Sequence, residues 1–203
     1  MRRVVLASES PRRAELLRQM GLSFEVQPSS VDESLVNGSS PAEFVREAAM
    51  RKATHVAHLV DDAIVIGADT VVVLDEHLLG KPTDAAHAAS MIRMLRGRSH
   101  SVVTGIAVVE ANGGTLGRSV SDHVETVVHF RPLTEREVEA YVASGEPMGK
   151  AGAYAIQGLG SMLIEGIEGD YFNVVGLPVC RLAQVLARFG VHPLEAASGV
   201  RVR

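Results

Sequence analysis

The chain has little cysteine and no long hydrophobic run. Cys180 is the single cysteine among 203 residues, so an intrachain disulfide is excluded and a reducing compartment is indicated. Near the amino terminus, Met1-Arg2-Arg3 precedes only a short apolar run that ends before Ser8. That run is too short for a signal peptide or a membrane span. We therefore expect a cytoplasmic protein.

Positive charge is also in short supply. The formal net charge is −4, which argues against a general nucleic-acid-binding protein, because such proteins need a basic face. An anionic small molecule would instead need a local cluster of cations. Only three of the twenty cationic side chains are lysines, namely Lys52, Lys81 and Lys150. Because a compact ammonium and a planar guanidinium are not interchangeable at a tight phosphate site, these positions are candidates for one, with chance as the alternative.

Several catalytic motifs are missing. No Gly-x-x-x-x-Gly-Lys-[Ser/Thr] segment occurs, which excludes a P-loop enzyme, and no Gly-x-Gly-x-x-Gly follows the first apolar run. Ser8 and Ser10 lie outside any Gly-x-Ser-x-Gly elbow, so a serine hydrolase is disfavoured. The histidines show no pairing typical of a metal site.

What is present indicates a mixed α/β fold. Hydrophobic residues make up 46% and charged residues 22%, as in ordinary soluble proteins, and 203 residues suit one large domain or two joined lobes. Strands and helices alternate first, and more strands follow. We expect helices over 41–60, 134–144 and 178–189, and a further helix that is capped by Thr83 or Asp84 and ends at Arg96. We also expect a buried strand over 63–74, a hairpin of strands 101–110 and 118–131, short strands over 154–157, 162–167 and 171–175, and a flexible tail over 191–203.

The turn after the first apolar run carries the most informative pattern. Ser10 is a good N-cap, and Pro11 suits the first helical position. Arg12 and Arg13 then fall in the first turn, where cations oppose the helix dipole. The helix N–H groups and two guanidinium forks together make a strong site for a polyanion such as a triphosphate. The alternative is a pair of solvated surface arginines.

Two charged residues interrupt apolar patterns. Lys52 falls on the apolar face of the 41–60 helix, where an ammonium needs a partner or an opening, with snorkelling to water as the alternative. Asp69 interrupts the 63–74 strand, where a carboxylate needs a metal, a cation or several donors. Its alternative role is to cap a turn between two strands. Gly67 nearby marks a bend or a close approach of another backbone segment.

These residues fit metal-assisted phosphoryl chemistry. Carboxylates from Asp69 and from the pair Asp32 and Glu33 can hold a hard divalent cation that bridges phosphate oxygens. Arginine and lysine can offset the charge that develops in the transition state. A carboxylate near the metal can also deprotonate the attacking water.

The chain resembles the Maf family of nucleoside triphosphate pyrophosphatases in five segments that occur in the expected order. They are 6–13 (LASESPRR), 67–70 (GADT), 80–82 (GKP), 150–158 (KAGAYAIQG) and 174–178 (VVGLP). The resemblance extends to about Phe189 and implies one domain over 1–190. That domain would be a two-lobed α/β fold of the Maf and inosine-triphosphatase type, with an elongated central mixed sheet flanked by helices and a cleft between the lobes. The implied reaction is hydrolysis between the α and β phosphates to a monophosphate and pyrophosphate, with Mg²⁺ or Mn²⁺.

The resemblance also implies roles for individual residues. Asp69 would accept the proton, and Glu33 and Asp69 would hold the metal. The phosphate-binding positions are Ser8, Arg12, Arg13, Lys52 and Lys81. The catalytic residues would be Asp69, Glu33, Lys52 and Lys81. Ser10, the N-cap of the helix that carries Arg12 and Arg13, would also belong to the substrate site. The positions tied to substrate choice are Arg12, Thr70 and Gln157.

The version of the 150–158 loop found here is similar to that of the branch acting on dTTP and UTP. Many family members carry an acidic residue where this chain has Gly149, so the loop departs from the family pattern there. We expect a nucleoside triphosphate as partner, no nucleic acid or membrane, and a house-cleaning role in the nucleotide pool; a homodimer is left open. The alternatives are hydrolysis of 7-methylguanosine triphosphate, a phosphatase that releases orthophosphate, and a nucleotide-binding regulator, for example of cell division, with vestigial hydrolysis.

Overall fold

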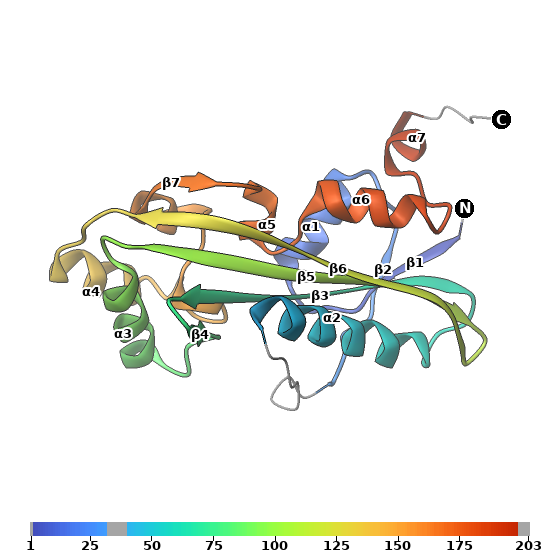
Figure 1. Cartoon of the computed structure of the whole chain (residues 1–203), viewed down its shortest axis with the longest axis horizontal. Helices are drawn as coiled ribbons and strands as arrows, with labels where there is room; N and C mark the ends of the chain where they lie inside the picture. The colour runs from blue at the N-terminus through green and yellow to red at the C-terminus, as the bar shows by residue number, and fades with distance from the viewer. Residues whose placement is uncertain (1, 32–39, 199–203) are drawn as a thin grey trace. The chain divides into compact units, whose positions relative to one another are not determined.

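Figure 1 shows the computed structural model of the chain, which describes residues 2–31 and 40–198. The chain divides into two compact units. Unit 1 comprises Met1–Asp69, Thr104–Val124 and Gly176–Arg203, and unit 2 comprises Thr70–Val103 and Glu125–Val175. The strands hydrogen-bond in the order β2-β1-β3-β5-β6-β7, with β4 paired to β3.

Strands and helices alternate along the chain, as expected. The strands are β1 (Arg3–Leu6), β2 (Glu25–Val26), β3 (Ala63–Leu74), β4 (His77–Leu79), β5 (Ser99–Asn112), β6 (Thr115–Phe130) and β7 (Ile164–Glu168). The helices are α1 (Pro11–Gln19), α2 (Pro41–Ala57), α3 (Ala85–Leu95), α4 (Glu135–Ala143), α5 (Tyr171–Val175), α6 (Val179–Ala187) and α7 (Pro193–Ser198), with 3-10 turns η2 (Ala151–Ala153) and η3 (Gly158–Leu163). Strand β1 is parallel to β2 and β3, whereas β3 with β4 and β6 with β7 are antiparallel, which confirms a mixed sheet.

In unit 1, helices cover both faces of the sheet. Helix α2 lies against one face, and α1 and α6 lie on the other (Figure 1). The α2 side is a core of small aliphatic side chains from α2 and from β1, β3 and β5, including Ala49, Ala53, Val56, Val65 and Ala107. Because these side chains are short, the helix can sit close to the sheet.

Two glycines let α2 approach the strand backbone directly. A Cβ atom at Gly67 in β3 would lie 2.2 Å from the main-chain oxygen of Ala49. A Cβ atom at Gly105 in β5 would lie 2.2 Å from the main-chain oxygen of Val45. Neither distance is sterically possible, so any larger residue must push the helix away. This confirms the close backbone approach that the sequence indicates at Gly67.

We predict that Gly67→Ala lowers the free energy of unfolding by about 1–3 kcal/mol, the usual cost of overpacking a core. Urea denaturation measures the effect. Gly80→Ala is the matched control, because a Cβ atom there meets nothing within 4 Å. Its effect should stay within about 0.5 kcal/mol. Equal losses in the two variants would contradict the account of α2 packing.

Unit 2 has a core of its own. It is formed by β4, α3, α4 and the parts of β3, β5 and β6 that belong to this unit. Side chains start both helices as the sequence predicts: Asp84 accepts a hydrogen bond from the N–H of His87 at 2.7 Å, and Thr134 with Glu137 forms a capping box. These caps fix where the chain leaves the strands and turns into helix.

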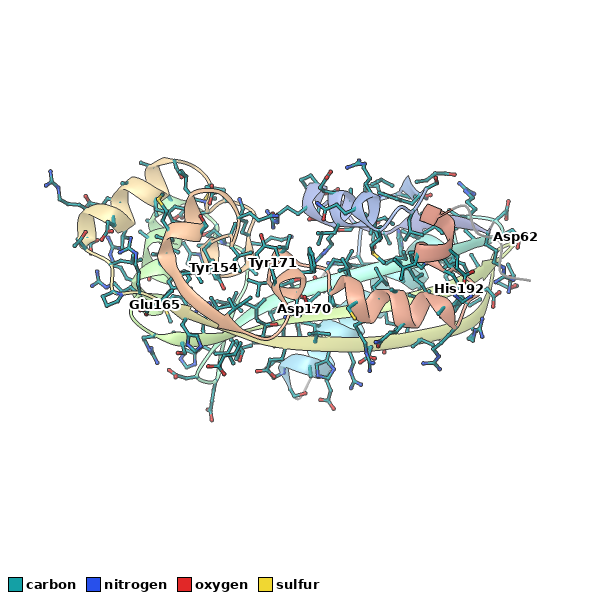
Figure 2. All side chains as sticks on the ribbon, turned by 90° about the horizontal axis from the view of Figure 1, so that it is seen from above. Asp62, Tyr154, Glu165, Asp170, Tyr171 and His192 are labelled. Atoms are coloured by element: carbon teal, nitrogen blue, oxygen red, sulfur yellow. The ribbon has the colours of Figure 1, made fainter. Side chains whose placement is uncertain are left out.

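A buried polar pair lies within the unit 2 core. His100 on β5 is 4% exposed, and its Nε2 lies 2.7 Å from the hydroxyl of Tyr154, which Figure 2 labels. The ring of Phe130 packs edge-on against both. Burial, and to a lesser degree the nearby His129, lowers the pKa of His100 to about 4. His100 is therefore neutral in the folded protein at neutral pH.

This pKa shift predicts a pH-dependent stability. Below about pH 6.5 the unfolded chain protonates this histidine, while the folded chain resists protonation down to about pH 4. His100 therefore has no effect above pH 6.5, and between pH 6.5 and 4 it lowers the free energy of unfolding by about 1.4 kcal/mol for each pH unit. Unfolding measured across this window should show a flatter slope for His100→Gln. A wild-type slope in His100→Gln would refute the assignment.

Two of the predicted short strands are wrong. Residues 154–157 are not a strand, because Gly152 and Ala153 have φ angles of 67° and 60° and turn the chain just before them. Residues 171–175 form helix α5, which begins where the Asp170 carboxylate accepts a hydrogen bond from the N–H of Phe172 at 2.8 Å. In both places the local turn overrides the β-propensity of aromatic and branched residues. The third, 162–167, is displaced to β7.

The C-terminal segment carries two helices. Helix α6 confirms the predicted helix over 178–189, although it is shorter. Helix α7 lies inside the stretch 191–203 that the sequence indicates as a tail, and Val191 before it is buried. In the described part of the chain, no helix has the length and apolar character needed to cross a lipid bilayer.

Candidate functional site

The start of helix α1 has the cap that the sequence predicts. The Ser10 hydroxyl accepts a hydrogen bond from the N–H of Arg13 at 3.4 Å, and Pro11 occupies the first turn. No acidic residue lies in this turn, which instead carries Arg12 and Arg13, both half-buried. The positive end of the helix dipole and two guanidinium groups therefore occur together, an arrangement suited to an anion.

Arg13 is held in place by unit 1 itself. Its Nε donates to the main-chain oxygen of Gly176 at 2.9 Å, and its Nη1 donates to the hydroxyl of buried Ser8 at 3.1 Å. Two bonds from one guanidinium fix the plane of the group. Gly176 has a φ angle of 119°, which other residues rarely adopt. Local sequence patterns do not predict this contact, because the two partners lie 163 positions apart.

Lys52 and Asp69 form a buried ion pair. Lys52 Nζ lies 2.6 Å from Asp69 Oδ1, and the side chains are only 11% and 9% exposed. Lys52 therefore does not snorkel to water, and Asp69 lies within the continuous strand β3 rather than in a turn. Gly67 and Asp69 are two residues apart and face the same side of β3. The close approach of α2 at Gly67 thus brings Lys52 to Asp69.

The start of α1 and Asp69 both follow the stretch over which β1 and β3 are paired. Strands β1 and β3 run parallel with Leu6 opposite Ile66, and the N–H of Ala7 donates to the oxygen of Ile66 at 2.8 Å. Continuing this register, Ser8 is level with Ala68, one residue before Asp69. Unit 1 therefore combines a helix start whose charges suit an anion with a carboxylate held by an ammonium.

We predict that Lys52→Met lowers the free energy of unfolding by about 3–5 kcal/mol, because it leaves the Asp69 carboxylate buried without its ammonium. The double variant Lys52→Met with Asp69→Leu replaces both charges by apolar side chains and should recover most of that loss. Chemical denaturation of the wild type, Lys52→Met and the double variant measures these differences in the free energy of unfolding. A double variant no more stable than Lys52→Met alone would show that the pair is not the source of the loss.

Three predicted site residues lie in unit 2. Thr70 follows Asp69 on β3 and is half-buried, whereas Lys81 and Gln157 are exposed. The segment that carries Lys81 is tied to the 150–158 loop, because the N–H of Gly152 donates to the oxygen of Gly80 at 3.0 Å. A Cβ atom at Gly152 would lie 2.7 Å from a methyl carbon of the Val72 side chain, which explains the glycine there.

A carboxylate that the sequence analysis did not single out holds the same loop. Glu146, in the turn after α4, accepts hydrogen bonds from the N–H groups of Leu159 and Gly160. Burial alone would raise the pKa of Glu146, but these two bonds, the Tyr141 hydroxyl and the charge of Lys150 outweigh it and leave the pKa below its usual value. In the sequence, only the neighbouring Gly145 and Pro147 indicate a turn at Glu146, and no local pattern indicates which groups its carboxylate binds.

The departure from the family pattern at Gly149 has a local explanation. Gly149 has a φ angle of 72°, a region that favours glycine, and a Cβ atom there would meet nothing within 4 Å. Lys150, the next residue, donates a hydrogen bond to the main-chain oxygen of Glu146. The Lys150 ammonium thus binds the backbone of the turn that precedes it.

The structure describes only one part of the predicted metal site. Asp32 and Glu33 lie outside the described residues. Elsewhere in 2–31 and 40–198, no three histidine, cysteine, aspartate or glutamate side chains are grouped to hold a metal ion. Asp69 is the member of the predicted ligand pair that is described. Its hard carboxylate oxygens, of which Oδ1 accepts the Lys52 bond, are of the type that Mg²⁺ and Mn²⁺ prefer.

The fold is that of a known class. A solved structure of a HAM1 protein from Coxiella burnetii matches with a TM-score of 0.50 and 16% identity, over 93% of this chain and 100% of that chain. The chain therefore has a mixed α/β fold of the HAM1 type. A family model for Maf-like proteins matches residues 3–189, and the chain belongs to that family. This confirms the resemblance carried by the five sequence segments.

Close relatives extend over the same length. A dTTP/UTP pyrophosphatase of Pelotomaculum thermopropionicum is 52% identical over 194 residues, covering 96% of this chain and 100% of the relative. A dTTP/UTP pyrophosphatase of Moorella thermoacetica is 53% identical over 191 residues, covering 94% and 97%. This chain is therefore similar to these relatives over nearly its whole length.

Proposed function

We propose that this chain hydrolyses dTTP and UTP between the α and β phosphates and releases the nucleoside monophosphate and pyrophosphate. Relatives with about half of their residues identical, and matched over nearly their whole length, carry the name dTTP/UTP pyrophosphatase. The structural observation that carries the proposal is the buried pair of Lys52 and Asp69, which follows the part of β3 that pairs with β1, the strand that leads into α1.

The start of α1 binds the triphosphate in this proposal. The hydroxyls of Ser8 and Ser10 and the guanidinium groups of Arg12 and Arg13 are suitable donors to phosphate oxygens, and the positive end of the α1 dipole favours the negative charge. Arg13 needs little reorganisation to bind, because Ser8 and Gly176 already fix its plane. Lys81 is a further phosphate ligand, and Thr70 and Gln157 select the nucleobase.

Asp69 is the base. Its carboxylate takes one proton from a water molecule while the water oxygen forms a bond to a phosphorus atom of the α–β anhydride. The bridging oxygen keeps the electron pair of the bond that breaks, so monophosphate and pyrophosphate separate and the proton later leaves Asp69 to solvent. Lys52 keeps the Asp69 carboxylate in one orientation through the 2.6 Å bond. It also offsets negative charge that builds up on the phosphates.

A divalent cation belongs to this proposal. Asp69 and Glu33 are the residues that would hold Mg²⁺ or Mn²⁺. When bound, the cation neutralises phosphate charge and makes the phosphorus atom a better target for water. We further propose that the reaction takes place in the cytoplasm and removes unwanted nucleotides from the pool, without nucleic acid or membrane as a partner, and that the chain acts alone or as a homodimer.

A panel of nucleotides tests the proposal. The protein is incubated with dTTP, UTP, CTP, GTP and 7-methylguanosine triphosphate, with Mg²⁺ or Mn²⁺ and separately with EDTA, and products are separated by chromatography. Metal-dependent release of monophosphate and pyrophosphate from dTTP and UTP is the expected result. Orthophosphate would mean a phosphatase, preference for 7-methylguanosine triphosphate would mean the other family branch, and binding without turnover would mean a regulator. Each of these outcomes overturns the proposal.

We predict that Asp69→Asn lowers kcat by about 10²–10⁴-fold, because the amide cannot accept the proton, while an amide oxygen can still accept the bond from Lys52. The far-ultraviolet circular dichroism spectrum should be unchanged. Asp61→Asn, at an exposed carboxylate of the same unit, is the matched control and should keep full turnover. Turnover near the wild-type rate in Asp69→Asn would remove this residue from the mechanism.

A further inference from the structure

Gln157 lies in a loop without regular hydrogen-bonded structure of its own. The turn at η2 ends before Tyr154, and η3 begins only at Gly158. Gln157 is exposed and has extended backbone angles, with φ −96° and ψ 163°. A side chain that selects a substrate needs a fixed backbone, so the loop must be held from outside.

Glu146 holds the loop on the carboxyl side of Gln157. Its Oε2 accepts a hydrogen bond from the N–H of Leu159 at 2.9 Å, and its Oε1 accepts one from the N–H of Gly160 at 2.8 Å. Leu159 and Gly160 are the second and third residues after Gln157. Hydrogen bonds from N–H groups to an ionised carboxylate are shorter and stronger than neutral ones, so this contact is well suited to fix a loop.

Tyr141 extends the same contact to the other side of Gln157. The Tyr141 hydroxyl, buried at the end of α4, donates to Glu146 Oε1 at 3.1 Å and accepts a hydrogen bond from the N–H of Ala155 at 3.3 Å. Ala155 is two residues before Gln157. One carboxylate and one phenol from α4 and its following turn thus hold both flanks of the exposed glutamine.

Two glycines leave room for this arrangement. A Cβ atom at Gly158 would lie 2.5 Å from Glu146 Oε2, and Gly158 also has a φ angle of 70°. A Cβ atom at Gly160 would lie 2.8 Å from the Tyr141 hydroxyl and 2.2 Å from the oxygen of Ala155. The loop is therefore shaped around the two polar groups, and it cannot keep this path with larger residues at these positions.

We propose that Glu146, with Tyr141, is a positioning residue that sets nucleobase selection by fixing the backbone on both sides of Gln157. This inference rests on the proposed function, in which Gln157 discriminates between bases. Glu146 does not touch substrate in this account and acts only through the loop. Its removal should therefore change the choice of substrate and KM more than kcat.

The test compares Glu146→Ala, Tyr141→Phe and Gln157→Ala with Glu165→Ala as control. Glu165 is an exposed carboxylate on β7 of the same unit, labelled in Figure 2. Two readouts are taken on each protein: hydrogen exchange of residues 155–160 without nucleotide, and kcat and KM for dTTP and CTP. A double variant, Glu146→Ala with Gln157→Ala, shows whether Glu146 acts through Gln157.

The expected result is faster exchange at Leu159 and Gly160 in Glu146→Ala, and at Ala155 in Tyr141→Phe, with Glu165→Ala unchanged. The ratio of kcat/KM for dTTP to that for CTP should fall by about five- to tenfold in Glu146→Ala, mostly through KM. The double variant should lose no more selectivity than Gln157→Ala alone. Glu146→Gln, which keeps one acceptor oxygen, should lie between wild type and Glu146→Ala.

Unchanged exchange in Glu146→Ala would overturn the proposal, because the loop would then be held by other contacts. Faster exchange with an unchanged substrate ratio, or additive losses in the double variant, would also overturn it, since Glu146 would be structural only. A wild-type chain that hydrolyses no nucleotide would instead refute the proposed function. The two failures are distinguishable because the exchange measurement uses no nucleotide.

Discussion

The close approach of helix α2 to strand β3 is the constraint on which unit 1 depends. Gly67 offers no side chain at the point of contact, so the backbone of α2 reaches the strand. This close approach brings Lys52 within hydrogen-bond distance of Asp69, and the attraction between the two charges offsets the cost of burying them. A side-chain methyl group at position 67 would push α2 away from β3 and separate Lys52 from Asp69. The packing of α2 and the formation of the Lys52–Asp69 pair therefore both depend on Gly67.

Unit 1 and unit 2 contribute different properties to the proposed activity. Unit 1 holds its charged groups firmly: Arg13 is bonded to Ser8 and Gly176, and Asp69 to Lys52. Rigid donors stabilise developing negative charge without reorganisation, which is usually the largest single contribution to catalysis. A rigid carboxylate is already oriented to accept a proton. In unit 2 an exposed loop, bonded to Glu146, carries Gln157. Substrate choice can then vary with the loop while the chemistry stays fixed.

The sequence predicts the features that depend on nearby residues. The cap at Ser10, the apolar face of α2 and the need of Lys52 for a partner all follow from local patterns. The contacts of Arg13 with Gly176 and of Glu146 with Leu159 and Gly160 do not, because their partners are brought together by the fold. The aromatic and branched residues of 171–175 predict a strand, whereas the Asp170 carboxylate starts a helix there.

The most direct test of the central claim is a crystal structure of Asp69→Asn bound to dTTP and Mg²⁺. The account predicts that the phosphates lie at the start of α1 and contact the guanidinium groups of Arg12 and Arg13 and the hydroxyls of Ser8 and Ser10. It also predicts that the α–β anhydride lies next to position 69, within reach of one water molecule. A triphosphate bound elsewhere, or bound at α1 with the anhydride away from position 69, would contradict the account.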